Sequence, residues 1–227
     1  MAQGTTLRDL LIDEIRDLYD AERQLVKALP KMAKGATSQE LRSLIETHLG
    51  ETEEQVTRLE RAFEMLGEKP RGKRCEGIAG IIEEGSNLLE EDFDGAVLDA
   101  GIIAGAQRAE HYEITAYGSV MAWAKQLGEN EIAELLSETL EEEKSADEKL
   151  SALAEGTINV EAAQSEGDDA ESDEEDEDTD RQREAGTARR AGGDMRMSAA
   201  SSPRGSGAGR SSGKGGSSGS AGGRRRS

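Results

Sequence analysis

The sequence predicts an all-α protein built as a four-helix bundle with one long crossover. Apolar residues recur at spacings of three and four in four long segments, which is the period of an amphipathic helix. These segments lack the alternation of apolar and polar residues that marks a half-buried strand. The connections between them are short, long and short, in that order. Two short links favour two antiparallel helical hairpins, and the long link allows the chain to travel the length of a bundle.

The first two helices are expected to meet at a short turn. The first should cover residues 6–34, and Pro30 should kink it or begin its end, because proline has no backbone N–H. Ser38 is a suitable N-cap for the second helix, since its hydroxyl can accept from a free backbone N–H. Gly67 follows Leu66 and should end that helix.

The chain between the two hairpins is predicted to hold a shorter helix. A linker over residues 68–74 contains proline and glycine, and a helix weakened by three glycines is expected over 75–89. The whole connection is about 27 residues long. Two hairpins joined by one long crossover is the ferritin-like connectivity, which an up-down-up-down bundle would not need.

The second hairpin contains the third and fourth bundle helices. The third should open at Asp94 and run to Leu127, where Gly128 ends it. The fourth is expected over about residues 130–155, with Gly156 after it. The turn between these helices is even shorter than the turn of the first hairpin, so they too should be antiparallel.

Acidic residues lie in the middle of otherwise apolar stripes on all four bundle helices. A carboxylate without a partner in a helical core costs several kcal/mol or becomes protonated, so these side chains need partners. Two divalent metal ions would nearly balance five inward carboxylates. Oxygen-rich ligation favours iron or manganese over zinc or copper. The predicted metal ligands are Glu22, Glu51, Glu110, Glu143 and Asp147, with His48 and Glu113 as additions.

The acidic residues are also predicted to lie at one level of the bundle. Glu22 is about 12 residues before the end of its helix, and Glu51 is about 13 after the start of the next. At a rise of ~1.5 Å per residue these two are level in an antiparallel pair. Glu110 and Glu143 are displaced by about three residues, or ~4.5 Å, which uncertain helix ends absorb. The spacing therefore supports one shared site.

The ligand pattern departs from the ferritin-like template, which has Glu-x-x-His pairs on two helices. In this chain the order is reversed in His48-x-x-Glu51, and the fourth helix offers Glu143-x-x-x-Asp147. Both spacings still place two side chains on one face of a helix. The departure leaves the site rich in carboxylates and poor in nitrogen ligands.

Other polar residues of the stripes are candidates for supporting the site. Tyr117, two turns beyond Glu110, is expected to be a hydrogen-bonding or redox partner, and Gln55 and Gln107 could orient ligands. The alternative for each lone glutamate is a place at the edge of the core with its carboxylate in solvent. His48 could also be a neutral core histidine bonded to Gln55.

Composition predicts a domain boundary at residue 164. Residues 1–164 contain 35 acidic and 17 basic residues, and 165–180 contain 11 acids and no base. Residues 181–227 contain 11 bases, two acids and much glycine and serine. Such a segment buries too little surface to offset its chain entropy. The predicted organisation is a helical domain over 1–164 and a disordered tail over 165–227, acidic first and then rich in Gly, Ser and Arg.

Other features of the chain bear on compartment and partners. Cys75 is the only cysteine, so an intrachain disulfide is impossible. An apolar run of about 18 residues and an N-terminal signal core are both lacking, so the expected setting is the cytoplasm, without membrane insertion. The acidic domain argues against nucleic-acid binding by the folded part, whereas the basic end of the tail could make weak, salt-dependent contacts with nucleic acid.

Four segments of the helices form a recognisable set. They are 17–25 (DLYDAERQL), 48–52 (HLGET), 110–118 (EHYEITAYG) and 139–144 (TLEEEK). With these segments in this order, residues 6–163 resemble the YciF/YciE branch of the ferritin-like superfamily. The resemblance implies a ferritin-like bundle, a homodimer, a role in bacterial stress responses and a dimetal site. Some members carry His in place of Glu53 and Glu in place of Gly50, so the ligands on the second helix differ within that branch.

Three functions from different classes are compatible with these features. The first is a dimetal oxidoreductase in which iron or manganese reacts with peroxide or oxygen. The second is metal sequestration or storage without turnover, fed by the glutamate-rich faces of the second and fourth helices. The third is a non-catalytic scaffold whose tail binds partners. A Ser-His-Asp triad is disfavoured, because the chain has two histidines and no nucleophile elbow between a strand and a helix.

Overall fold

The fold was taken from a computed structural model, which describes residues 5–93 and 95–164. Within these ranges the chain forms five α-helices and one π-helical turn and contains no strand. They are α1 (Leu7–Gly35), α2 (Gln39–Leu66), α3 (Glu76–Leu88), α4 (Gly95–Leu127), α5 (Asn130–Leu153) and η1 (Ala154–Ile158). The predicted disordered tail and the predicted boundary at residue 164 lie outside the described residues and stay predictions.

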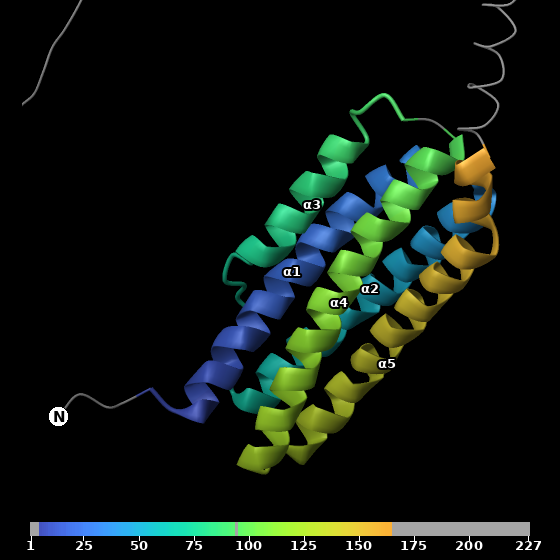
Figure 1. The fold of residues 1–227 in the computed structure, drawn as a ribbon. Coiled ribbons are helices and arrows are strands. Elements are labelled where there is room, and N and C mark those ends of the chain that lie inside the picture. The colour runs from blue at the N-terminus through green and yellow to red at the C-terminus, as the bar shows by residue number, and fades with distance from the viewer. Residues whose placement is uncertain (1–4, 94, 165–227) are drawn as a thin grey trace, which may run out of the picture. The chain divides into compact units, whose positions relative to one another are not determined.

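The four long helices form the bundle and the short helix lies on its outside. Helices α1 and α2 form one antiparallel hairpin and α4 and α5 the other, while α1 packs on α4 and α2 on α5 (Figure 1). The crossover carries α3, which packs against α1 and α4 (Figure 1). The prediction of an all-α, ferritin-like bundle with a short helix in its crossover is confirmed.

The helix ends follow the local signals in the sequence. Thr6 and Asp9 form a capping box at the start of α1, and the Ser38 hydroxyl accepts from the Leu41 N–H at the start of α2. Gly67 and Gly128 have positive φ angles of 71° and 80°, the left-handed conformation that ends a helix cheaply only at glycine. Ser38 and Gly128 thus confirm the predicted turns of the two hairpins, and Gly67 confirms the predicted end of the second helix.

One predicted helix end is confirmed and one is wrong. Pro30 lies inside α1, which ends at Gly35, one residue beyond the predicted end at 34, and Ala33 and Ala36 pack in the core after the proline. Gly156 does not end the fourth helix: η1 carries the chain past it, and residues 159–164 are helical. Ile158 of η1 is buried among apolar residues of α4, and this burial outweighs the low helix propensity of glycine. Asp94, the predicted start of α4, lies outside the described residues.

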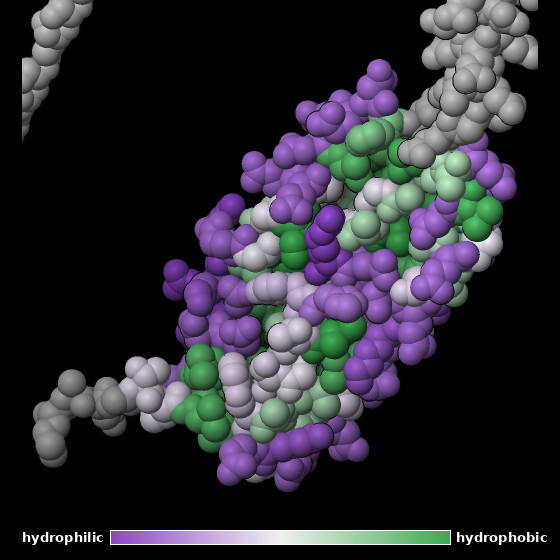
Figure 2. Space-filling view, in the orientation of Figure 1, coloured by the Kyte–Doolittle hydropathy of each residue, from purple (hydrophilic) through white to green (hydrophobic). Residues whose placement is uncertain are grey.

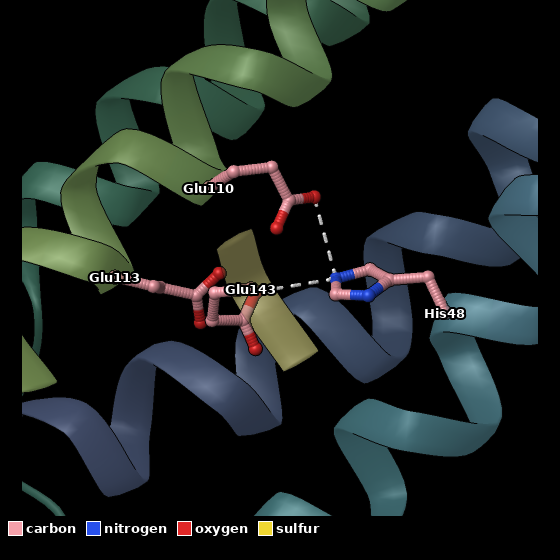
Figure 3. Close-up of side chains that lie close together, drawn as sticks. All are labelled: His48, Glu110, Glu113 and Glu143. Atoms are coloured by element: carbon pink, nitrogen blue, oxygen red, sulfur yellow. Dashed lines mark ion pairs between the residues drawn. The ribbon is translucent and has the colours of Figure 1, made fainter. Parts of the chain in front are cut away.

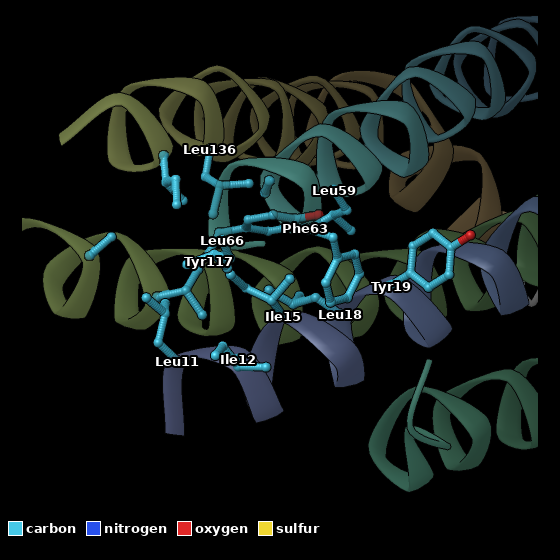
Figure 4. Packing of buried hydrophobic residues seen from close by; sticks show 14 of the residues in the cluster. Leu11, Ile12, Ile15, Leu18, Tyr19, Leu59, Phe63, Leu66, Tyr117 and Leu136 are labelled. Carbon is cyan, nitrogen blue, oxygen red and sulfur yellow. The ribbon is translucent and has the colours of Figure 1, made fainter. Parts of the chain in front are cut away.

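The apolar core consists of two clusters at different heights of the bundle. The lower cluster, shown in Figure 4, includes Leu11, Ile15, Leu18, Leu59, Phe63, Tyr117 and Leu136. The upper cluster includes Leu25, Leu29, Leu41, Ile45, Ile102, Ile103 and Leu150. Every bundle helix contributes to both clusters, and near the boundary between its two contributions each helix places buried polar residues. A buried polar layer therefore separates two apolar cores.

The outer face of the bundle is mostly polar. In Figure 2 hydrophilic side chains cover much of the visible face, and apolar groups gather in smaller patches between them. None of the helices described here is long and apolar enough to span a lipid bilayer.

Candidate metal centre in the polar layer

The polar layer brings together side chains from all four bundle helices. Its buried members are Glu22 of α1, His48 of α2, Glu110 and Glu113 of α4, and Glu143 of α5. Each occupies the core-facing stripe of its helix, where the flanking turns are apolar. For the last four, one ligand atom of each lies within 4.8 Å of the others, and their side chains point toward a common centre (Figure 3).

His48 lies at one end of the layer and uses both ring nitrogens. Its Nε2 is 3.4 Å from Glu110 Oε1 and 3.8 Å from Glu143 Oε2, and these contacts are the dashed lines of Figure 3. Its Nδ1 is 3.4 Å from Glu51 Oε2 on the outer side. Glu51 therefore holds the ring so that Nε2 faces the carboxylates, as the outer partner of a ligating histidine does.

Tyr117 lies at the opposite end of the layer. Its phenol donates a short hydrogen bond to Oε1 of Glu22, and both side chains are fully buried. Burial, followed by the charge of Glu22, raises the pKa of Tyr117 well above its usual value. The phenol therefore keeps its proton and serves as a donor to the carboxylate.

Burial also changes the acidity of the carboxyl groups in the layer. Loss of water is the largest cause that raises the pKa of Glu22, Glu110 and Glu113 well above the usual value for glutamate. Repulsion between neighbouring carboxylates raises these pKa values further, with Glu143 acting on Glu22 and Glu110. The layer therefore resists carrying its full negative charge without a compensating cation.

Several carboxylate oxygens of the layer have no hydrogen-bond donor among the described residues. They are Glu22 Oε2, Glu110 Oε2, both oxygens of Glu113, and Glu143 Oε2. Buried polar atoms in native proteins are nearly always satisfied, and an unpaired buried charge costs several kcal/mol. Oxygen ligands that converge without donors are suited to divalent cations such as manganese or ferrous iron. The donor set of the layer therefore fits a metal centre.

A hydrogen-bond network orients Glu143 from outside the layer. The Gln55 amide donates to Glu143 Oε1 at 2.5 Å and to Glu142 Oε2 at 3.1 Å. Arg58 in turn donates two hydrogen bonds to the Glu142 carboxylate, at 2.5 and 2.6 Å. The predicted role of Gln55 in orienting a ligand is thus supported by its contacts, whereas the alternative bond from His48 to Gln55 is not formed among the contacts of this ring.

Two predicted ligands lie at the rim of the layer. Asp147 Oδ1 accepts from Gln107 at 2.9 Å, and its other oxygen is 3.3 Å from the exposed His111 ring. The side chain of Glu51 is 29% exposed and lies 3.4 Å from the outer nitrogen of His48, Nδ1. The other five predicted ligands lie together, with Glu113 at the centre rather than as an addition. Metal ligation by any of the seven stays a prediction.

The pattern of the sequence did not identify Arg58 or Glu142 as part of the site. Glu142 is held by Arg58, with only about a quarter of its side chain exposed (26%). The available signal was the position of Arg58 three residues after Gln55, on the same side of α2. An arginine next to a row of predicted ligands suggests a partner for one of the acids beside them.

The His48 end of the layer lies close to solvent. A small cavity adjoins His48 and Glu110, and its outer lining includes Thr47 and Glu51 of α2 and Lys149 of α5. A second small cavity touches the same two residues from beneath α3. The Tyr117 end, in contrast, is packed into the lower apolar cluster. The two ends of the layer therefore differ in their access to water.

Comparison with known sequences identifies relatives of this chain. Residues 6–163 match a family described as "Domain of unknown function (DUF892)". The chain is 40% identical to protein YciF of Escherichia coli strain K12 over 158 residues, which cover 69% of this chain and 95% of YciF. The resemblance to the YciF branch is confirmed.

Solved structures share the fold. The crystal structure of the E. coli stress protein YciF matches with a TM-score of 0.66 at 39% identity, covering 69% of this chain and 99% of YciF. YcfI of Rhodopseudomonas palustris, described as a candidate structural protein, matches with a TM-score of 0.64 at 45% identity, over 66% of this chain and 97% of YcfI. A protein of Xanthomonas campestris pv. campestris, 23% identical with a TM-score of 0.58, covers 71% of this chain and 99% of its own, and shares the fold alone.

Proposed function

The chain belongs to the DUF892 family, and we propose that it is a stress-associated protein whose bundle binds a carboxylate-bridged pair of iron or manganese ions. Its similarity to the stress protein YciF supports the stress association. The observation that carries the metal proposal is the set of buried carboxylate oxygens without donors, which converge from α1, α4 and α5. Structural glutamates in a stable core would be paired or neutralised.

Five side chains would hold the ions. Glu22, Glu110, Glu113 and Glu143 supply oxygen ligands, and His48 supplies Nε2. A bound pair of iron or manganese ions would supply electrons to a peroxide or to oxygen. The chain's own residues orient the ligands, exclude bulk water through the two apolar clusters, and hold a proton on Tyr117 beside Glu22.

A metal-binding experiment tests the proposal. Protein expressed with ample iron and manganese and purified without chelators should contain about two ions per chain, because four inward carboxylates need that charge. The double variant Glu22→Gln and Glu110→Gln should lose both ions. The matched control, Glu54→Gln with Glu148→Gln, changes two exposed glutamates of α2 and α5 and should keep them. Wild-type protein that is free of metal and binds neither ion on titration would refute the proposal.

Two further functions are separated by oligomeric state and turnover. We expect a homodimer, which cannot enclose a mineral core, so sedimentation distinguishes a dimetal enzyme from a storage shell with many irons per chain. Rapid consumption of peroxide or oxygen by the ferrous dimer, followed by ferric absorption in the near ultraviolet, would support the enzyme. A dimer with neither property would support the scaffold function, which the description of YcfI as a candidate structural protein favours.

A further inference from the structure

The two ends of the polar layer offer different ligand atoms. The chain has two histidines, and only His48 faces the layer, since the side chain of His111 is 70% exposed. The imidazole Nε2 adjoins Glu110 and Glu143. At the opposite end Glu22 accepts from Tyr117, and Glu113 lies between the two ends, with one carboxylate oxygen within 4.8 Å of the ligand atoms of His48, Glu110 and Glu143. One end therefore presents nitrogen and oxygen, and the other presents oxygen alone.

Glu143 lies between the two ends. Its Oε2 is 3.8 Å from His48 Nε2, and it belongs to the same group of neighbouring ligand atoms as Glu110 and Glu113. Its Oε1 is held by Gln55, while Oε2 has no donor among the residues described. The oxygens without donors extend across the layer: Glu110 has one near His48, Glu113 has two in the middle, and Glu22 has one at the tyrosine end. Glu143 is thus placed to contact ions at both ends of the layer.

We propose that the layer contains two unequal metal positions: an outer one at His48 that prefers ions with affinity for nitrogen, and an inner all-oxygen one at Glu22 and Glu113 that prefers manganese. The proposal rests on the proposed function and deepens it. Imidazole suits iron and zinc, whereas carboxylates suit manganese. The outer position also adjoins the cavity lined by Glu51 and Lys149, so ions exchange there more readily than at the sealed inner end. A mixed supply of metals should therefore yield a mixed pair.

Displacement of manganese by zinc tests this inequality without any measurement of catalysis. Protein loaded with two Mn²⁺ per chain should show the electron paramagnetic resonance spectrum of a coupled pair. One equivalent of Zn²⁺ should release one Mn²⁺ and leave the hyperfine-split spectrum of an isolated Mn²⁺, because zinc takes the position with the imidazole. A second equivalent of Zn²⁺ should release much less Mn²⁺. Equal release of both ions would overturn the proposal.

Variants at the two ends assign the positions. His48→Gln should weaken zinc binding at least about tenfold, because a ligand is lost rather than its outer partner, and should keep one Mn²⁺. The control His111→Gln removes the exposed histidine and should behave as wild type. Glu22→Gln should instead weaken retention of the second Mn²⁺ and leave zinc binding unchanged, because Glu22 lies at the Tyr117 end. Loss of both ions in a folded His48→Gln variant, or unchanged zinc affinity, would contradict the proposal.

The two proposals fail in distinguishable ways. If the wild-type chain binds no Mn²⁺, the proposed dimetal function is refuted and the inequality with it. If it binds two ions that zinc displaces equally, the dimetal function stands and only the inequality is wrong. Circular dichroism of each variant verifies its helix content, and if His48→Gln does not fold, the result for Glu22→Gln decides the question.

Discussion

Two buried acidic regions of this bundle differ in how their oxygens are satisfied. Asp99 of α4, 1% exposed, sits beneath the turn between α1 and α2. Its carboxylate accepts from the Thr37 N–H at 2.8 Å, the Thr37 hydroxyl at 2.6 Å and the Ser38 N–H at 2.7 Å. These donors stabilise the charge without any ion. Asp99 therefore ties the start of the second hairpin to the turn of the first.

The polar layer shows the opposite arrangement. Its glutamates are as deeply buried as Asp99, yet their oxygens mostly face one another, and few donors approach them. Burial alone therefore does not separate a structural acid from a metal ligand. The number of donors on each buried oxygen does, because an acid that serves the fold is satisfied by the fold.

The sharpest test of this comparison is the removal of the satisfied acid. Asp99→Leu should lower the free energy of unfolding by about 3 kcal/mol, because three donors lose a charged acceptor in a buried place. Asp99→Asn should cost less, since its amide oxygen still accepts. Urea denaturation of both variants measures the difference. An Asp99→Leu variant as stable as wild type would show that the turn does not depend on this carboxylate.

In the polar layer, by contrast, loss of a buried carboxylate should raise the free energy of unfolding. In the presence of a chelator, Glu113→Gln should raise the free energy of unfolding by about 1–2 kcal/mol, because it removes a buried charge without donors and keeps the shape. With Mn²⁺ present, wild-type protein should be more stable than the variant, since the variant gains less stability from the bound ion. Chemical denaturation with and without metal tests both signs. A loss of stability in the chelated variant would place Glu113 with Asp99 as a structural acid.

The pH dependence of stability should also show that the carboxyl groups of the layer are buried without donors. The pKa values of Glu22, Glu110 and Glu113 are raised in the fold, so their contribution to stability is full below the usual glutamate pKa and is lost as pH rises through the raised values. Metal-free protein, kept in a chelator, should therefore gain stability as pH falls from 7 toward about 5, near the unperturbed range of the glutamate pKa. Thermal unfolding at several pH values measures this gain, which should be smaller in Glu113→Gln.

The smallest expected effect concerns the network outside the layer. Arg58→Met should free Glu142 and loosen Gln55, and so weaken Mn²⁺ binding by up to about tenfold, with little change in folding stability. Isothermal titration with Mn²⁺ measures the affinity. Arg61→Met, on the same helix at an exposed position, is the matched control. Equal affinities in both variants would show that Glu143 is positioned without this network.

Much of the fold and part of the site could be predicted from the chain alone. Glu22, Glu110 and Glu143 interrupt apolar stripes of period 3.6, and that period is a property of the backbone helix. Asp147 and Glu51 were assigned to the same stripes, but they lie at the rim, because residues three or four apart share a face only approximately. Asp99 had no signal, since its donors belong to another hairpin.

The sequence by itself determined the helices, their turns and the common level of the acids, because periodicity, capping residues and chain length act locally. Only the tertiary structure decided how far each helix is rotated about its axis. That rotation places Glu113 among the other carboxylates and turns Asp147 toward Gln107. It also decides which buried oxygens meet a donor. Donors and acceptors on different helices are matched by packing across the whole bundle, and no local pattern records that match.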